Sequence, residues 1–143
     1  MEIVFSAHGS YRHQYHIVWI PKYRRKVLKA GVKTYAEKGF HELMEHYPEV
    51  KLIQWNIQMD HVHLIAEIPP KHCVSTIIQK IKANTSRKIR KRFEWIRKVY
   101  TKDAFWSPGF FSSTVGLNEK QIARYVEFQE KVDKGEYQLQ LPL

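Results

Sequence analysis

The sequence predicts a single α+β domain in which two helices cover one face of an antiparallel sheet and a further helix lies near the end of the chain. Segments of strand-like composition alternate with segments of helical periodicity, and most end at a proline, a glycine or a turn. Hydrophobic residues make up 43% of the 143 residues, enough for a core that needs neither disulfides nor a structural metal. With no repeat or linker, we expect one domain over 1–143, with open roles for 1–10 and 134–143.

The first half of the chain predicts a strand, a helix and two further strands. Residues 11–20 are rich in aromatic and β-branched side chains and stop at a proline, which is typical of a strand. Apolar residues recur at three- and four-residue steps over 32–47, the spacing of a helix with one buried stripe. The run 50–68 is too long for one strand and breaks most naturally at Met59-Asp60, giving an antiparallel pair, 50–58 and 61–68.

The second half of the chain predicts a helix, a strand and a last helix. The first of these helices begins after Pro70, runs to about Phe93 and is strongly basic in its later part. A strand over 110–115 follows a Trp-Ser-Pro-Gly turn, and Asn118 with Gln121 forms a capping box that starts the last helix. This order fits the ferredoxin-like (RRM-like) fold, which leaves the other face of the sheet free for nucleic acid.

The charge of the chain points to a polyanionic partner. Lys and Arg number 24 against 14 acidic residues, which gives a net charge of +10 and a pI near 9.7. Because the basic residues fall in several separate segments, nucleic acid is favoured over a membrane surface. Cys73 is the only cysteine, so there is no intramolecular disulfide, and no apolar run has the length of a membrane span. We expect a soluble, cytoplasmic protein.

His61 and His63 form the sharpest local signal for chemistry. Side chains alternate across a strand, so residues two apart point the same way, roughly 7 Å apart along the chain. Two imidazoles placed in this way can share one metal ion. The plainer interpretation is a pair of histidines on a solvated sheet face.

Tyr125 and Gln129 form the second signal, four residues apart and therefore on one side of the last helix. A tyrosine is a poor nucleophile while protonated, and a metal that polarises a phosphodiester would lower the demand on it. A glutamine one turn away offers an oxygen ligand to complete a two-histidine site. The alternative is that Tyr125 packs in the core.

Basic and aromatic residues interleave in two segments, a pattern suited to phosphates and unpaired bases. On charge alone we predict DNA contacts by five of these residues: Lys22, Arg24, Arg25, Arg87 and Lys88.

Four motifs in order carry a resemblance to the TnpA family, the single-tyrosine HUH transposases of insertion sequences that move as single strands, a group related to the REP-associated tyrosine transposases. They are Tyr-His-Ile-Val-Trp-Ile-Pro-Lys-Tyr-Arg-Arg-Lys-Val-Leu over 15–28, Gln-Met-Asp-His-Val-His-Leu over 58–64, Trp-Ser-Pro-Gly-Phe-Phe over 106–111 and Tyr-Val-Glu-Phe-Gln over 125–129. The resemblance implies that His61 and His63 are the HUH histidines, Tyr125 the nucleophile and Gln129 the third metal ligand.

The resemblance also implies a reaction and its partners. Such proteins bind imperfect DNA hairpins and cleave a single strand beside them, which leaves a 5′-phosphotyrosine and a free 3′-hydroxyl. They work as homodimers, with the histidine pair of one subunit often beside the tyrosine-bearing helix of the other. Mg²⁺ is the ion expected by resemblance, although two imidazoles suit Mn²⁺ at least as well.

Two other functions remain open from the sequence. One is a domesticated HUH endonuclease acting on chromosomal palindromes, or a replication initiator or relaxase of the wider HUH class. The other is a non-catalytic RNA- or single-strand-binding module in which Tyr11, Tyr15 and Trp19 stack on bases. The second predicts binding that needs no metal and gives no covalent product.

Overall fold

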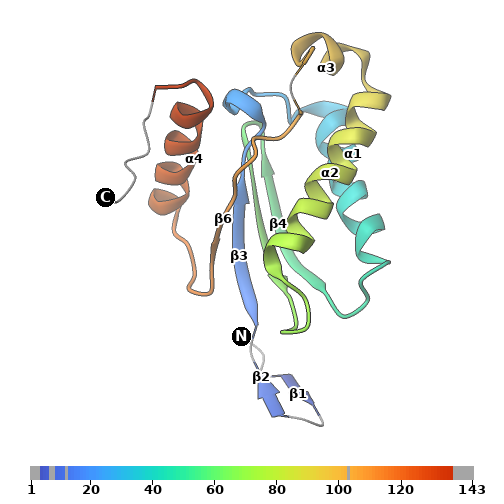
Figure 1. The fold of residues 1–143 in the computed structure, drawn as a ribbon, viewed down its shortest axis with the longest axis vertical. Helices are drawn as coiled ribbons and strands as arrows, with labels where there is room; N and C mark the ends of the chain where they lie inside the picture. Colours follow the sequence, from blue (N-terminus) through green and yellow to red (C-terminus); the bar gives the residue numbers. More distant parts are fainter. Residues whose placement is uncertain (1–3, 7–8, 12, 103, 137–143) are drawn as a thin grey trace, which may run out of the picture.

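The computed structural model describes residues 4–6, 9–11, 13–102 and 104–136. At its start, β1 (Val4–Ser6) pairs antiparallel with β2 (Gly9–Tyr11) in a small sheet of its own, set apart from the main sheet in Figure 1. The strand predicted over 11–20 is therefore divided: Tyr11 ends β2, and β3 runs from Gln14 to Trp19.

The main sheet has four strands in the order β4-β5-β3-β6, and every neighbouring pair is antiparallel. With β3, its strands are β4 (Lys51–Gln58), β5 (His61–Glu67) and β6 (Phe111–Ser113). The hairpin turn at Met59-Asp60 and the antiparallel pair on either side are as predicted. β6 is shorter than the predicted 110–115, because only Phe111–Ser113 pair with β3. Chain order and strand order together give the ferredoxin-like arrangement, which confirms the predicted fold class.

Two helices, α1 (Ala30–Met44) and α2 (Val74–Arg92), lie together on one face of this sheet (Figure 1). Alternate strand residues such as Trp19, Val62 and Leu64 are fully buried against them, since side chains two apart on a strand share a face. The predicted stripe over 32–47 runs past the end of α1 into a turn, where Tyr47 still packs on the core. The short helix α3 (Glu94–Val99) follows α2 and was not predicted.

The last helix, α4 (Glu119–Asp133), packs on the opposite face of the sheet, on the left in Figure 1. Val126 is buried there against Val18 and Ile20 of the β3 segment. The predicted capping box is present, with Asn118 and Gln121 exchanging hydrogen bonds of 2.9 and 3.0 Å. The expectation that this sheet face is free was wrong in part, because the apolar stripe of α4 needs burial and finds it there.

A tight turn of 3₁₀ helix, η1 (Lys22–Arg24), lies between β3 and α1 in the chain. Tyr23 and Arg24 have left-handed backbone angles (φ 62° and 56°), which cost on the order of 1 kcal/mol each for residues other than glycine. Hydrogen bonds from the Lys22 N–H to the Phe105 carbonyl and from the Tyr100 hydroxyl to the Lys22 carbonyl, each 2.8 Å, hold the turn in place. Within the described residues, no helix is both long and apolar enough to cross a membrane.

Candidate active site

The histidine pair lies on β5, on the sheet face that carries α4. Val62 and Leu64, which alternate with His61 and His63, are fully buried under α1 and α2, so the core fixes which way the pair points. This is the placement that the sequence predicts for residues two apart on a strand.

Asp60 orients His61. The Nδ1–H of His61 donates to Asp60 Oδ1 at 2.8 Å, and the other carboxylate oxygen accepts from Arg24 Nε at 2.9 Å. Burial alone would raise the pKa of the Asp60 carboxyl, but hydrogen bonds from His61 and Arg24, with their charges, hold that pKa below its usual value. With Nδ1 engaged by a carboxylate, Nε2 of His61 is the nitrogen left for a metal ion, and a carboxylate partner makes a histidine a better ligand.

A third histidine, which the sequence analysis missed, contacts the pair. His16 on β3 lies with its Nδ1 3.3 Å from Nε2 of His63, and the two rings are 5.5 Å apart. Burial lowers the pKa of His63, with the charges of His16 and His61 acting in the same direction, and burial also lowers the pKa of His16. Both rings therefore favour the neutral form, which is the form that binds metals. The available signal was that His16 precedes Ile17, which is buried in the core, so His16 points to the opposite sheet face, where the pair lies.

A hollow of about 410 Å³ opens beside the histidine pair, between the β4–β5 hairpin and the first half of α4. It is lined by Arg24, Asn56, Gln58, Asp60, His61, His63, Glu119, Ile122, Ala123 and Val126.

Tyr125 and Gln129 share one side of α4, as their spacing predicts, but that side faces β6 rather than this hollow. The Tyr125 ring lies 5.7 Å from the Phe111 ring, and its hydroxyl donates to Gln129 Oε1 at 3.4 Å. The two residues line a separate hollow of about 680 Å³, with Phe110, Phe111, Gln121, Arg124 and Phe128. Burial raises the pKa of the Tyr125 phenol. Of these two hollows, one is lined by the two histidines and the other by the tyrosine and the glutamine.

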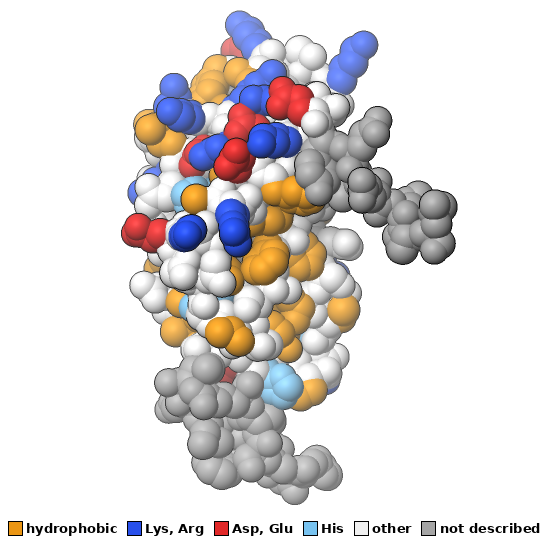
Figure 2. Space-filling view, turned by 90° about the vertical axis from the view of Figure 1, so that its left-hand side faces the viewer, with side chains coloured by type: hydrophobic (Ala, Val, Ile, Leu, Met, Phe, Trp, Pro, Cys, Tyr) orange, Lys and Arg blue, Asp and Glu red, His pale blue; other side chains and the backbone are white. Residues whose placement is uncertain are grey.

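The surface around α4 divides into two parts. Figure 2, which views this side, shows Lys and Arg intermixed with Asp and Glu over the upper part and hydrophobic side chains over the middle and lower part. Phe111 and Val115, at 42% and 73% exposed, are among the large hydrophobic residues that solvent reaches.

Four of the five predicted DNA contacts have partners within the protein. Arg24 pairs with Asp60 and Glu130, Lys88 with Glu42 at 3.1 Å, and Lys22 lies 3.8 Å from Asp133. The Arg25 guanidinium lies over the rings of Tyr23 and Tyr100 and donates to the Val99 carbonyl.

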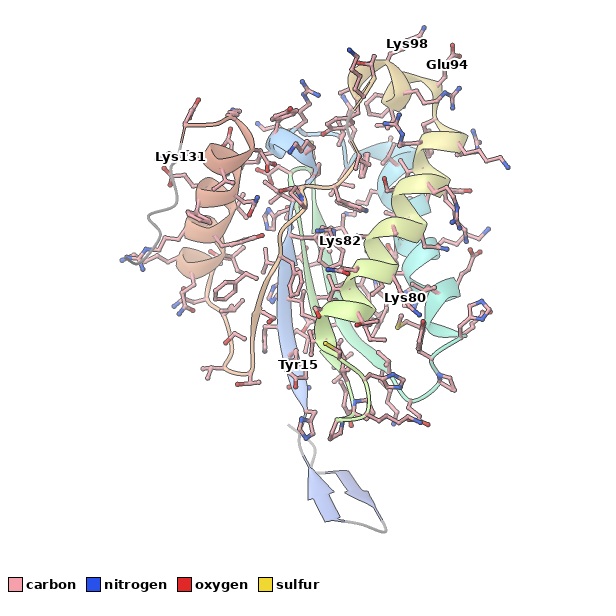
Figure 3. All side chains as sticks on the ribbon, in the orientation of Figure 1. Tyr15, Lys80, Lys82, Glu94, Lys98 and Lys131 are labelled. Atoms are coloured by element: carbon pink, nitrogen blue, oxygen red, sulfur yellow. The ribbon has the colours of Figure 1, made fainter. Side chains whose placement is uncertain are left out.

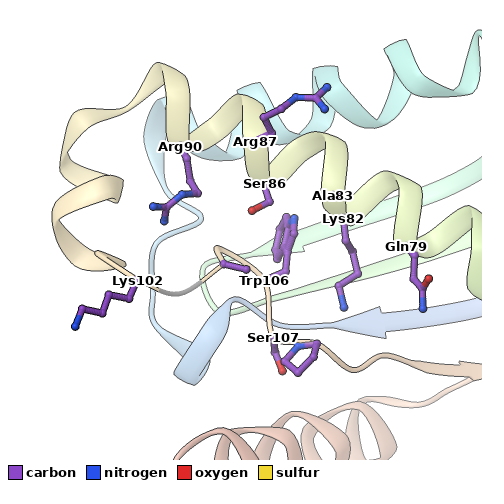
Figure 4. A pocket seen from close by; sticks show the side chains of 11 residues that line it. Gln79, Lys82, Ala83, Ser86, Arg87, Arg90, Lys102, Trp106 and Ser107 are labelled. Atoms are coloured by element: carbon purple, nitrogen blue, oxygen red, sulfur yellow. The ribbon is translucent and has the colours of Figure 1, made fainter.

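Arg87, the fifth, is exposed and lines a third hollow of about 600 Å³ on the α2 side of the sheet. Figures 3 and 4 show Lys82 reaching from α2 toward the segment before β6, and Figure 4 shows Arg90 and Lys102 around the same space. Burial lowers the pKa of Lys82 to about 8, against the opposing charge of Asp133. The described lining residues carry no carboxylate: Gln79, Lys82, Ala83, Ser86, Arg87, Arg90, Lys102, Ala104, Trp106, Ser107 and Pro108.

The positions of Trp19 and Tyr15 test the alternative function, a binding module in which these side chains stack on bases. Trp19 is fully buried between the rings of Phe40 and Trp106, and Tyr15 packs against the same core. Trp19 is thus not available to stack on a base. The side chain of Tyr11 lies outside the described residues.

The chain belongs to the family of IS200-like transposases, since the family model described as "Transposase IS200 like" matches residues 9–129. The family inferred from the four motifs is thereby confirmed. The chain is 32% identical over 136 residues to the transposase for insertion sequence element IS200 of Salmonella typhimurium (strain LT2), covering 95% of this chain and 89% of that protein. It is 24% identical over 123 residues to the ISDra2 transposase TnpA of Deinococcus radiodurans, covering 83% and 85%.

Solved structures share the fold. A crystal structure of a presumed transposase from Deinococcus radiodurans R1 superposes with a TM-score of 0.75 at 24% identity, covering 83% of this chain and 92% of that one. A REP-associated tyrosine transposase bound to a REP hairpin superposes with a TM-score of 0.54 at 16% identity, covering 89% and 74%.

Proposed function

We propose that this transposase cleaves and rejoins single-stranded DNA beside hairpins through a 5′-phosphotyrosine on Tyr125, with a divalent metal ion held by His61, His63 and Gln129. The observation that carries the proposal is the histidine pair, anchored by core residues on one sheet face, with the Nδ1 of His61 engaged by Asp60. Arrangements of this kind orient a histidine toward a metal ion.

The donor set fits a divalent ion. Within the described residues, no three His, Cys, Asp or Glu side chains gather to hold an ion, so the pair needs a ligand of another type. The amide oxygen of Gln129 supplies one, and Mg²⁺ and Mn²⁺ both accept oxygen ligands beside imidazoles. When bound, the ion would act as a Lewis acid on the scissile phosphate. A metal at Nε2 of His63 would replace the contact with His16.

Tyr125 supplies the nucleophilic oxygen. Its Oη forms a bond to phosphorus, the bond from phosphorus to the 3′ oxygen breaks, and the phenol proton is passed to solvent while the leaving 3′ oxygen is protonated. The phosphotyrosine keeps the energy of the phosphodiester, so another 3′-hydroxyl can reverse the step without ATP. Burial raises the pKa of the Tyr125 phenol, whose ring packs against Phe111, so the side chain is expected to become more exposed before it reacts.

The site is assembled between two subunits in this proposal. In the single chain, the first half of α4 lines the hollow beside the histidine pair, while Tyr125 and Gln129 line the other hollow, next to β6. A homodimer that brings α4 of one subunit to the histidine pair of the other supplies all four groups. The exposed hydrophobic side chains near β6 are suited to such a contact. A monomeric mass by light scattering would count against this part.

Hairpin DNA is the proposed substrate. One structural relative, a REP-associated tyrosine transposase, was solved bound to a REP hairpin. The hollow around Arg87 has a cationic lining with no carboxylate among its described residues, which suits DNA phosphates, whereas Arg24 and Lys88 pair with carboxylates. A host protein acting on chromosomal palindromes would use the same chemistry, and only the choice of hairpin separates it from the transposase.

The test uses 5′- and 3′-labelled hairpin oligonucleotides with single-stranded flanks, taken from the ends of the element that carries the gene. The protein is incubated with Mg²⁺ or Mn²⁺ and the products are separated on denaturing gels. We expect a metal-dependent protein–DNA adduct that carries the 3′ label, together with a released 5′-labelled fragment. Both products should be absent in Tyr125→Phe and in His61→Ala. Binding without metal and without an adduct, by a folded protein, would reject the catalytic function in favour of a binding module.

A further inference from the structure

Asp133 is a buried carboxylate next to the proposed metal ligand. It lies one helical turn beyond Gln129 and two beyond Tyr125, on the same side of α4, and its side chain is 1% exposed. Its Oδ1 accepts from Gln129 Nε2 at 3.1 Å and from Ser107 Oγ at 2.9 Å. Its Oδ2 accepts from the Tyr23 backbone N–H at 3.0 Å. All of these donors converge on one side chain from three segments of the chain.

We infer that Asp133 is a positioning residue that fixes the orientation of the Gln129 amide, so that the amide oxygen is presented to the metal ion. The inference rests on the proposed function, in which Gln129 is a ligand. The two ends of an amide are nearly the same size, but only the oxygen has lone pairs for a metal. A carboxylate only accepts hydrogen bonds, so it admits the NH₂ end of Gln129 and directs Oε1 away from itself.

The direction of Oε1 agrees with the chemistry of α4. Oε1 of Gln129 lies 3.4 Å from the Tyr125 hydroxyl, so the ligand oxygen and the nucleophile sit side by side. Gly109 bounds the same oxygen: a Cβ at this position would lie 2.7 Å from Oε1. The amide is thus confined by Gly109 and held by Asp133.

The cost of burying this carboxylate is offset by the segments that meet it. The left-handed turn at Tyr23 (φ 62°) belongs to the segment whose N–H reaches Oδ2, and the Lys22 ammonium lies 3.8 Å from Oδ1. These contacts also fasten the end of α4 to the body of the protein. A role as anchor alone is therefore the competing explanation, and the test must separate it from orientation of the amide.

Asp133→Asn keeps the shape and changes the hydrogen bonding. If its oxygen stays on the Tyr23 N–H, its NH₂ faces Gln129, whose amide must turn its oxygen inward and its NH₂ toward the metal. Ser107→Ala is the matched control, because it removes another hydrogen bond to the same carboxylate and leaves the Gln129 contact intact. Mn²⁺ affinity by titration calorimetry or electron paramagnetic resonance, hairpin affinity in EDTA and thermal melting are measured for both variants.

The expected result is a Mn²⁺ dissociation constant raised about tenfold or more in Asp133→Asn, the range typical of lost outer-shell partners, but raised less than twofold in Ser107→Ala. Hairpin affinity in EDTA should be unchanged in both. Equal Mn²⁺ affinities in the two variants would overturn the inference and leave Asp133 as an anchor.

A second background keeps the test decisive even when Asp133→Asn alone fails to fold. In Gln129→Glu both terminal atoms of the side chain are oxygens, so either one can face the metal ion. Adding Asp133→Asn to this variant also removes the carboxylate that would lie beside the carboxylate introduced at position 129. The second change should then cost less than twofold in Mn²⁺ affinity. A tenfold loss in this background would overturn the inference. Absence of Mn²⁺ binding and of any adduct in the wild type would instead reject the proposed function itself.

Discussion

Substitution of Arg24 tests whether this residue stabilises the fold or contacts DNA. Its guanidinium joins the β4–β5 hairpin to α4, donating to Asp60 at 2.9 Å and to Glu130 at 3.0 Å. The side chains of the three residues are 19–32% exposed, so each pair is worth more than a fully exposed pair and less than a buried one. At about 1 kcal/mol each, Arg24→Met should lower the free energy of unfolding by about 2 kcal/mol. For a chain of this size the melting temperature falls by about 6 °C.

The assay for Arg24→Met combines thermal melting with hairpin binding at several salt concentrations. We expect the lower melting temperature and an unchanged slope of log affinity against log salt. The two carboxylates already neutralise the charge of the guanidinium, so it does not bind a phosphate. Metal-dependent cleavage should fall as well, since Asp60 loses a partner and holds His61 less firmly. A melting temperature equal to that of the wild type, with a slope reduced by about 0.9, would refute the argument and make Arg24 a phosphate contact.

Three further predictions test other parts of the structure. Arg87→Gln, at the cationic hollow, should leave the unfolding free energy within about 0.5 kcal/mol of wild type and reduce the salt slope of hairpin binding by about 0.9; an unchanged slope would remove Arg87 from the DNA surface. The pKa of Lys82 falls from the ordinary 10.5 to about 8 on folding, so the stability of the wild type relative to Lys82→Met should rise by on the order of 3 kcal/mol between pH 8 and 10.5, where only the unfolded chain keeps the proton. Denaturant titrations at pH 7 and 10.5 measure this, and a pH-independent difference would contradict it. Val126→Ala should cost about 2 kcal/mol and speed hydrogen exchange in α4 more than in α1; a uniform increase would show that α4 does not detach by itself.

Local periodicity was enough to predict the parts of the site that lie on one element. His61 and His63 share a sheet face because side chains alternate along a strand, and Tyr125 and Gln129 share a side of α4 because four residues make about one turn. The Asn118 capping box and the hairpin turn at Met59-Asp60 were also visible in the sequence, since each depends on residues a few positions apart.

Tertiary structure alone decided which of these groups meet. The contact of His16 with His63 joins residues 47 positions apart, and the hydrogen bond from Tyr23 to Asp133 joins residues 110 apart. Likewise, the sequence showed Arg24 as one charge in a basic run, but the fold places Asp60 and Glu130 around it. No periodicity links such positions, because they come together only when the sheet orders its strands and α4 chooses a face. The sequence by itself determined most of the helices and strands of the main domain, the chemistry that they carry and the family. The packing of α4 on the open sheet face determined that Tyr125 and Gln129 line a different hollow from the histidine pair of their own chain.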